Sequence, residues 1–236
     1  MQDLPSPIKV RERRAWKPVT VEGDTDLKGS KFSGQPWLAA GESWPVCRNC
    51  GKPMQLLLQL NFNNIPESVR EQDGTGLLQL FYCVNDNPCC EIECEAWAPF
   101  SNSVLLRRIE SIPEPANINE TIPDNYFPAK TIVGWEEVED YPTEQEAKAL
   151  GVEITQDEQE IVESEASVVC GDKLGGWPNW FQSIEYPDCP VCHETMELFF
   201  QLQPGKNLPY GLFGCGCGHI TRCKQHRNQF AFGWAC

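Results

Sequence analysis

Residues 31–60 read KFSGQPWLAAGESWPVCRNCGKPMQLLLQL, and residues 173–202 read KLGGWPNWFQSIEYPDCPVCHETMELFFQL. The two stretches align without a gap at an offset of 142 residues, with ten identical positions. Composition alone would give about two such matches. The identical pairs are Lys31/Lys173, Gly34/Gly176, Pro36/Pro178, Pro45/Pro187, Cys47/Cys189, Cys50/Cys192, Met54/Met196, Leu56/Leu198, Gln59/Gln201 and Leu60/Leu202. We therefore interpret the chain as a duplicated unit, each copy of which carries a CxxC motif.

Each copy has the pattern of short strands and turns. The runs 56–60, 76–84 and 198–202 are short and apolar, and Gly, Pro and Asn separate such runs, which favours antiparallel sheet with few helices. A Gly two residues before a Pro opens each copy and predicts a tight, fixed loop, after which Trp37 and Trp180 lie over the sheet. The predicted fold class is α+β, with two sheet-rich pseudo-repeats of mostly antiparallel strands.

Four segments are predicted along the 236 residues. They are an N-terminal basic extension (1–30), a first repeat lobe (31–130), an acidic connector (131–168) and a second repeat lobe (169–236). Each lobe is of a size at which a hydrophobic core alone gives marginal stability, so a bound metal would be useful to it. Whether the two lobes share one core stays open at this point.

The connector is strongly acidic and partly helical by pattern. Residues 131–165 contain twelve acidic residues and one basic residue, in a chain of net charge −15. Thr143 and Glu146 form a capping-box pattern, and Gly151 is a helix stop signal. Together they predict a short helix between Thr143 and Gly151. Residues 153–165 have the spacing of a second amphipathic helix. The segment is interpreted as a solvated link, with an acidic docking surface for a basic partner as the alternative.

The charge balance argues against nucleic acid as a partner, because affinity for phosphate comes from clustered Lys and Arg. One basic stretch lies near the N-terminus, and we expect it to pair with the acidic connector rather than with phosphate; it contains Lys9, Arg11, Arg13, Arg14 and Lys17. No segment has the apolar length of a secretory signal or a membrane span. A cytoplasmic chain without a membrane partner is therefore expected, and there paired cysteines favour metal over disulfides.

The CxxC turns predict two structural zinc sites. The turn from Cys47 to Cys50 directs two thiolates at one ion, and Gly51 permits the positive φ that such knuckles often need. A strand end and the turn after it must supply the other two ligands. The predicted first set is Cys47, Cys50, Cys83 and Cys89, with Cys90 and Cys94 as alternatives. Buried free thiols would be the other interpretation of these cysteines.

In the second copy, Gly216 to Cys223 takes the place of Gly76 to Cys83, so Cys223 should end the matching strand. His226 follows at CxxH spacing. The predicted second set is Cys189, Cys192, Cys223 and His226, with Cys215 or Cys217 as rival ligands. His193 and His219 are interpreted as ordinary polar residues.

Little in the sequence points to catalysis. The sequence contains no GxSxG, HExxH, phosphate-loop or dinucleotide motif. A metal-bound thiolate is not free to attack a substrate, and cysteine-rich zinc sites are typically closed. An enzyme is therefore the less favoured interpretation, as a metal-dependent or thiol-dependent activity of unknown substrate.

Several runs resemble known families. Gly34 to Trp37, CRNCGKPM, LLLQL and GLLQLFYC, with the C-terminal KLGGWPNW, CPVC and FGCGCGHITRCKQHRNQFAFGWAC, resemble the YwqG-like family of bacterial proteins of unknown function. That family usually has an acidic residue where this chain has Cys215. The first copy is also similar to the zinc-binding part of programmed cell death protein 2, in CxxCG, LLQ and the later cysteines. That resemblance implies a chaperone of a basic ribosomal protein.

Together these features predict a cytoplasmic, zinc-stabilised protein-binding module, acting as a chaperone-like or assembly factor for a basic partner.

Overall fold

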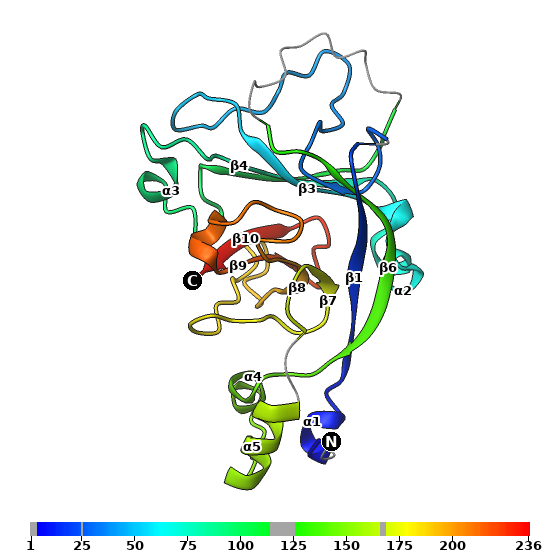
Figure 1. The fold of residues 1–236 in the computed structure, drawn as a ribbon, viewed down its shortest axis with the longest axis vertical. Coiled ribbons are helices and arrows are strands. Elements are labelled where there is room, and N and C mark those ends of the chain that lie inside the picture. Colours follow the sequence, from blue (N-terminus) through cyan, green and yellow to red (C-terminus); the bar gives the residue numbers. More distant parts are fainter. Residues whose placement is uncertain (1–3, 25, 114–125, 166–168) are drawn as a thin grey trace.

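The computed structural model describes residues 4–24, 26–113, 126–165 and 169–236. Within them the chain forms one ten-stranded antiparallel sheet and a few short helices (Figure 1). The strands are β1 (Arg13–Glu22), β2 (Lys31–Phe32), β3 (Gln55–Asn61), β4 (Leu77–Tyr82), β5 (Val104–Ile109), β6 (Lys130–Asp140), β7 (Lys173–Gly175), β8 (Glu197–Leu202), β9 (Cys217–Arg222) and β10 (Phe230–Ala235). The helices are α1 (Ser6–Lys9), α2 (Glu67–Asp73), α3 (Cys90–Glu93), α4 (Glu144–Ala149) and α5 (Gln156–Glu165), with 3₁₀ turns η1 (Phe62–Asn64) and η2 (Leu212–Cys215). The predicted sheet-rich α+β class is confirmed.

The sheet is arranged symmetrically about its two central strands, β1 and β6. It runs β10-β9-β8-β7-β1-β6-β2-β3-β4-β5, so each repeat contributes four consecutive strands and the long pair β1 and β6 lies between them. β1 precedes the first repeat in the chain but pairs with β7 of the second, while β6 precedes the second repeat but pairs with β2 of the first. The two repeats are therefore interleaved.

Equivalent side chains make equivalent hydrogen bonds in the two repeats. The Oε1 of Gln59 accepts from the backbone N–H of Trp37 at 2.9 Å, and the Oε1 of Gln201 accepts from that of Asn179 at 2.8 Å. The Nε2 of Gln59 donates to the carbonyl of Gly29, and the Nε2 of Gln201 donates to that of Gly171, both at 2.8 Å. These glutamines fix the loop that opens each repeat onto its sheet.

Both repeats share one hydrophobic core. Aromatic side chains meet across them: the ring of Phe32 lies 6.2 Å from that of Phe200, and the ring of Phe62 lies 5.9 Å from that of Phe199. A single cluster of buried residues joins β2, β3 and β4 to β8, β9 and β10. The question left open by the sequence is thus answered, because the two sets of strands pack against each other beside the β1–β6 ribbon (Figure 1).

The first part of the predicted connector is a strand rather than a solvated link. Residues 130–140 form β6, and residues 13–22 of the predicted extension form its partner β1, with Arg14 opposite Glu139. The guanidinium of Arg14 lies 3.4 Å from the carboxylate of Glu137 and 3.7 Å from that of Glu139. The expected pairing of the basic and acidic stretches is confirmed for Arg14, and it joins two paired strands through side chains that are about half exposed.

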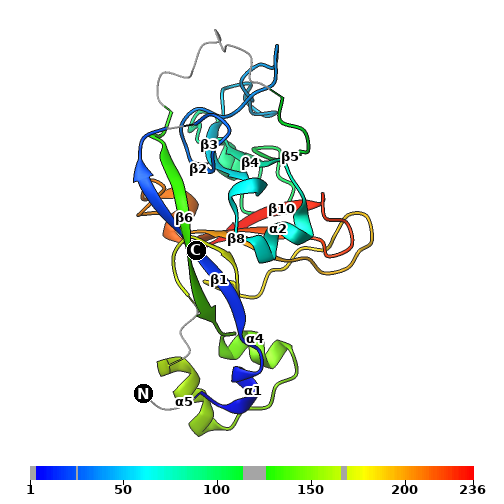
Figure 2. The same cartoon turned by 90° about the vertical axis from the view of Figure 1, so that its right-hand side faces the viewer.

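The second part of the connector is helical, as predicted. Thr143 caps α4 by accepting from the backbone N–H of Glu146 at 3.2 Å. The carboxylate of Glu146 does not complete the box; it accepts from Trp180 Nε1 at 2.6 Å and from the Tyr186 hydroxyl at 2.8 Å. The helices α1, α4 and α5 pack around a small core of their own at the end of the β1–β6 ribbon (Figure 2). We call this group the helical end.

No helix in the described ranges has both the length and the apolar character that crossing a membrane would require.

Candidate metal centres

Two clusters of metal-ligand side chains lie at equivalent strand ends, one in each repeat. No disulfide joins any of the thirteen cysteines, all of which the structure describes. The first cluster consists of Cys47, Cys50, Cys83 and Cys90, and the second of Cys189, Cys192, Cys223 and His226. Within each cluster the four ligand atoms lie within 4.8 Å of one another.

The CxxC turn is held by the same backbone bonds in both repeats. In the first, the N–H of Cys47 donates to the carbonyl of Lys52 at 2.8 Å, and that of Gly51 donates to the carbonyl of Cys47 at 2.9 Å. In the second, Cys189 and His193 make the matching bonds, each at 2.9 Å. Gly51 has the expected positive φ of 67°, and His193 adopts 61° at the same place. The turn therefore tolerates a side chain there.

The first cluster has the dimensions of a tetrahedral thiolate site. The sulfur of Cys47 lies 3.8 Å from that of Cys90, and the sulfur of Cys50 lies 3.7 Å from that of Cys83. Four thiolates bound to one zinc ion at about 2.3 Å would be separated by about 3.8 Å. The side chains are thus already arranged to surround a single ion.

Cys90, not Cys89, supplies the fourth thiol of this cluster. Cys89 precedes α3, whereas Cys90 is its first residue and is fully buried. The backbone N–H of Cys90 donates to the carbonyl of Asn85 at 3.1 Å, which brings the start of α3 back toward the CxxC turn. Asn49 Nδ2 also lies 3.4 Å from the Cys90 sulfur, a contact that no motif in the sequence predicts.

The second cluster brings together the four residues of the predicted set. The sulfur of Cys192 lies 3.6 Å from that of Cys223, and Nδ1 of His226 lies 3.7 Å from the sulfur of Cys223 and 3.9 Å from that of Cys189. Cys223 follows β9 as Cys83 follows β4, in the predicted equivalence. The rival ligands Cys94, Cys215 and Cys217 belong to neither cluster.

Local electrostatics divide the thiols into two kinds. Burial raises the pKa of Cys83 well above its ordinary value and that of Cys90 to about 11. Burial acts in the same direction on Cys189, but hydrogen bonds from the N–H groups of Cys192 and Val191 outweigh it and lower the pKa to about 6. Metal binding to either cluster must therefore displace protons from thiols, which makes the affinity depend on pH.

The clusters are closed by the chain itself. Each offers four ligand atoms, as many as a tetrahedral ion takes, and each ties a CxxC turn to the end of a neighbouring strand. An ion held in this way leaves no position for a water molecule or a substrate. The arrangement can pin strand ends together, and it does not present the open coordination position of a catalytic zinc.

Comparison with known proteins places the chain in a family. No curated protein matches the sequence. The family described as Domain of unknown function (DUF1963) matches residues 30–235, which include both repeats, both clusters and the helices between them. The match covers most of the chain, and we conclude that this protein belongs to the DUF1963 family.

Proposed function

We propose that the protein is a cytoplasmic binding scaffold that captures a basic protein partner, as a chaperone-like or assembly factor, and that one structural zinc ion stabilises each repeat. The closure of both clusters by four ligands from the chain carries this proposal, because it suits a metal that stabilises a surface rather than one that reacts. The matching bonds of the two repeats also support their origin by duplication.

Zinc is the metal that suits these ligands best. Sets of four thiolates, or of three thiolates and an imidazole, in tetrahedral arrangement select zinc or iron–sulfur centres over hard cations such as Mg²⁺ and Ca²⁺. The sulfur separations of 3.6 to 3.8 Å match a single small ion. Each repeat would then gain the folding free energy that its ligand bonds provide.

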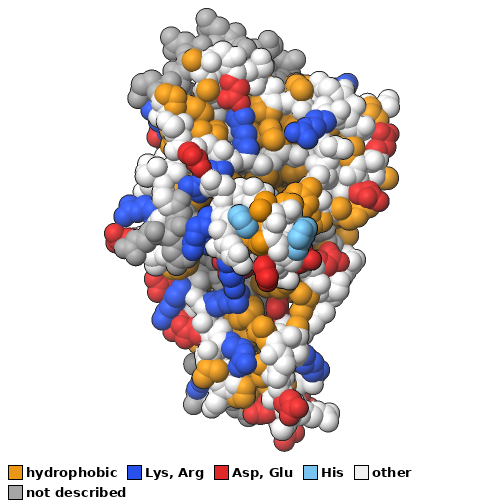
Figure 3. Space-filling view, turned by 180° about the vertical axis from the view of Figure 1, so that it is seen from behind, with side chains coloured by type: hydrophobic (Ala, Val, Ile, Leu, Met, Phe, Trp, Pro, Cys, Tyr) orange, Lys and Arg blue, Asp and Glu red, His pale blue; other side chains and the backbone are white. Residues whose placement is uncertain are grey.

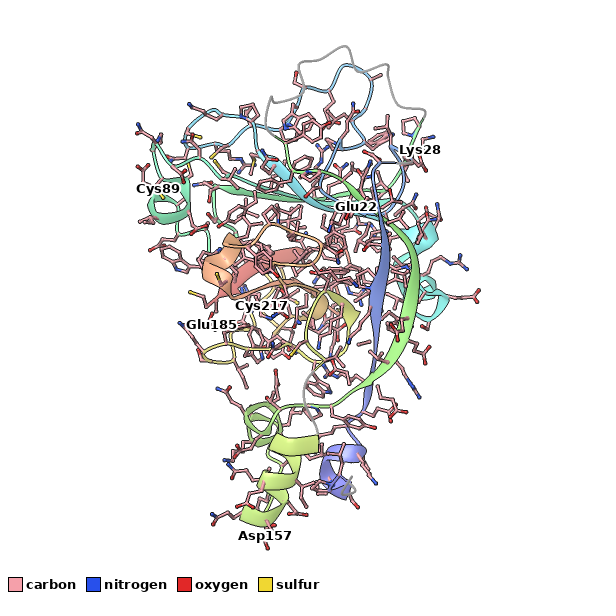
Figure 4. All side chains as sticks on the ribbon, in the orientation of Figure 1. Glu22, Lys28, Cys89, Asp157, Glu185 and Cys217 are labelled. Carbon is pink, nitrogen blue, oxygen red and sulfur yellow. The ribbon has the colours of Figure 1, made fainter. Side chains whose placement is uncertain are left out.

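The helical end supports a basic partner. Glu137 and Glu139 of β6 pair with Arg14, and Asp140 pairs with Lys173, so part of the acidic charge of β6 is already neutralised. In contrast, Glu153, Asp157 and Glu160 are exposed on and just before α5. Asp157 lies at the tip of the molecule (Figure 4). Lys and Arg side chains run down the middle of the face shown in Figure 3, and acidic ones lie at its lower tip.

The resemblance of the first repeat to programmed cell death protein 2 supports the same proposal, since it implies a chaperone of a basic ribosomal protein. A chain of net charge −15 also favours rapid association with a positively charged partner.

The test compares capture of basic proteins by the wild type and by a triple variant. The variant carries Glu153→Gln, Asp157→Asn and Glu160→Gln, and it retains Glu158, which caps α5 through Thr155. A control variant carries Glu95→Gln and Glu110→Gln, exposed acidic residues outside the helical end. We expect cross-linking and mass spectrometry at low salt to recover basic proteins with the wild type and the control, and far fewer with the triple variant. Equal recovery with all three, unchanged by salt, would contradict the proposal.

A further inference from the structure

A small cavity opens where the two repeats meet. It measures about 40 Å³ and is lined by Trp97, Trp180, Trp234, Glu185, His219 and Thr221, among others. The backbone N–H of Trp234 in β10 donates to the carbonyl of Trp97 at 3.1 Å, so the first repeat supplies one wall. About 10–15 Å³ of such space holds one water molecule, so the cavity accommodates a group of three or four heavy atoms.

Two buried polar atoms of the lining have no hydrogen-bond partner. They are Nε2 of His219 and Oγ1 of Thr221, in side chains that are 4% and 2% exposed. The other ring nitrogen of His219 donates to the backbone carbonyl of Asn179, and burial lowers the pKa of the ring to about 3, so the ring is neutral. In a neutral ring with one donating nitrogen, the other is an acceptor. Unpaired acceptors in such a place are costly, and a donor should satisfy them.

The first repeat shows which group occupies the equivalent place. Gln79 lies opposite Gln59 in the sheet as His219 lies opposite Gln201, so Gln79 and His219 are counterparts. Gln79 Nε2 donates to the carbonyl of Trp37 at 2.8 Å, as the His219 ring does to Asn179. The Oε1 of Gln79 then accepts from Nε of Arg107 at 2.8 Å. A guanidinium therefore satisfies the counterpart of the unpaired His219 nitrogen.

The second repeat lacks that arginine. Arg107 lies opposite Gln79, and the residue opposite His219 is Gly233. Similarly, Phe81 beneath the Arg107 guanidinium is replaced by Thr221. Loss of both large side chains leaves the space that the cavity occupies.

The cavity lining also offers groups of the kinds that hold the Arg107 guanidinium, at positions other than the equivalent ones. Arg107 forms an ion pair with Glu42 and lies over the ring of Phe81, with 5.5 Å between Cζ and the ring centroid. At the cavity, Glu185 provides a carboxylate, and the tryptophan rings provide aromatic faces that attract cations. Glu185 is labelled in Figure 4.

We propose that this cavity binds the guanidinium group of an arginine side chain, presented by the partner. The inference rests on the proposed function in naming a basic protein as the source of that arginine. Nε2 of His219 and Oγ1 of Thr221 accept from the guanidinium, and Glu185 neutralises its charge. Trp180 packs on His219, with ring centroids 4.5 Å apart, and donates to Glu146 of α4. One basic segment can therefore reach both the cavity and the helical end.

The test uses a capped arginine, N-acetyl-L-arginine amide, and follows the indole N–H signals of the three lining tryptophans by ¹H–¹⁵N NMR. We expect saturable shifts of these signals, and none with the capped citrulline, which is neutral and nearly identical in shape. Thr221→Val removes one hydrogen bond to a charged group and Glu185→Gln removes the neutralising charge, so each should weaken binding by about tenfold. The matched controls Thr195→Val and Glu194→Gln, exposed in the same repeat, should bind like the wild type.

Equal shifts with citrulline, or wild-type binding by Thr221→Val and Glu185→Gln, would overturn the inference. Tighter binding of free L-arginine than of the capped form would also overturn it, because a metabolite would then be the occupant. Neither the capped arginine nor the variants at Thr221 and Glu185 involve α5. If the probe fails while the triple variant of α5 still loses basic proteins, the cavity assignment is wrong and the proposed function stands.

Discussion

The Nζ of Lys173 lies 2.7 Å from Oδ2 of Asp140, and both side chains are completely buried. This ion pair joins the start of the second repeat to the end of β6. Asp140 also accepts from the backbone N–H groups of Val169 and Trp177, at 2.9 and 2.7 Å. The first repeat has a counterpart in Lys31 and Asp24, also at 2.7 Å, but there the carboxylate is 25% exposed.

Asp140→Asn should therefore destabilise the protein by about 3–5 kcal/mol, because it leaves the buried Lys173 ammonium without a compensating charge. Asp24→Asn is the matched control and should cost clearly less, since water reaches that site. Urea unfolding monitored by tryptophan fluorescence measures both. Equal losses in the two variants would show that burial of the pair does not set its importance.

Cys90→Ser should reduce the zinc content from two ions per chain to one, while Cys89→Ser should leave two, because the Cys90 thiol lies in the first cluster and the Cys89 thiol does not. Metal analysis of protein purified without chelator measures this directly. The Cys90→Ser protein should also unfold at a lower temperature. A wild-type protein without zinc would contradict the metal assignment altogether.

The buried His219 should make stability depend on pH. Its folded pKa is lowered to about 3 by burial, with the nearby Lys173 acting in the same direction, whereas the unfolded ring titrates near 6.5. Below about pH 6.5 the unfolded state thus binds one more proton, and the free energy of unfolding should fall by about 1.4 kcal/mol per pH unit down to pH 3.

His219→Gln should remove this part of the pH dependence, because glutamine, the residue at the equivalent position 79, does not titrate. Subtracting the variant's unfolding free energies from those of the wild type between pH 7 and 5 isolates the contribution from that of other groups. His193→Gln, at an exposed position, is the control. Parallel curves for the wild type and His219→Gln would contradict the prediction.

Much of the local structure could be predicted from the repeated pattern. The ungapped offset matched the CxxC turns and the strands after them, and strand equivalence placed Cys223 beside the second turn. The choice between Cys89 and Cys90 could not be made, because neighbouring residues in a turn point in different directions and spacing does not determine which one faces inward. The Thr155–Glu158 capping box, with hydrogen bonds in both directions, is also visible in the sequence as a T-x-x-E pattern.

The sequence pattern could not predict that β1 pairs with the second repeat and β6 with the first. Asp24 precedes Lys31 by 7 residues, whereas Asp140 precedes Lys173 by 33. The helices α4 and α5 cause this difference, because they are inserted between β6 and the second repeat, and they hide the equivalence of β6 to β1. Long-range pairing leaves no local signature in either strand: the opposite charges of the two stretches predict that they attract each other, but not that they form neighbouring strands. The sequence also could not predict the role of His219. That role is inferred from its counterpart Gln79, whose side-chain oxygen accepts from Arg107.

The position of β6 also sets an order of events during synthesis. The ribosome releases β1 to β5 before residues 130–140. Until β6 emerges, one edge of β2 has no paired strand and β1 has none on either side. Uncovered strand edges pair readily with other chains. The nascent chain is therefore most exposed to aggregation just before β6 emerges, and β1 stays unpaired on one side until β7 follows. Completion of the first half of this protein depends on the arrival of its second half.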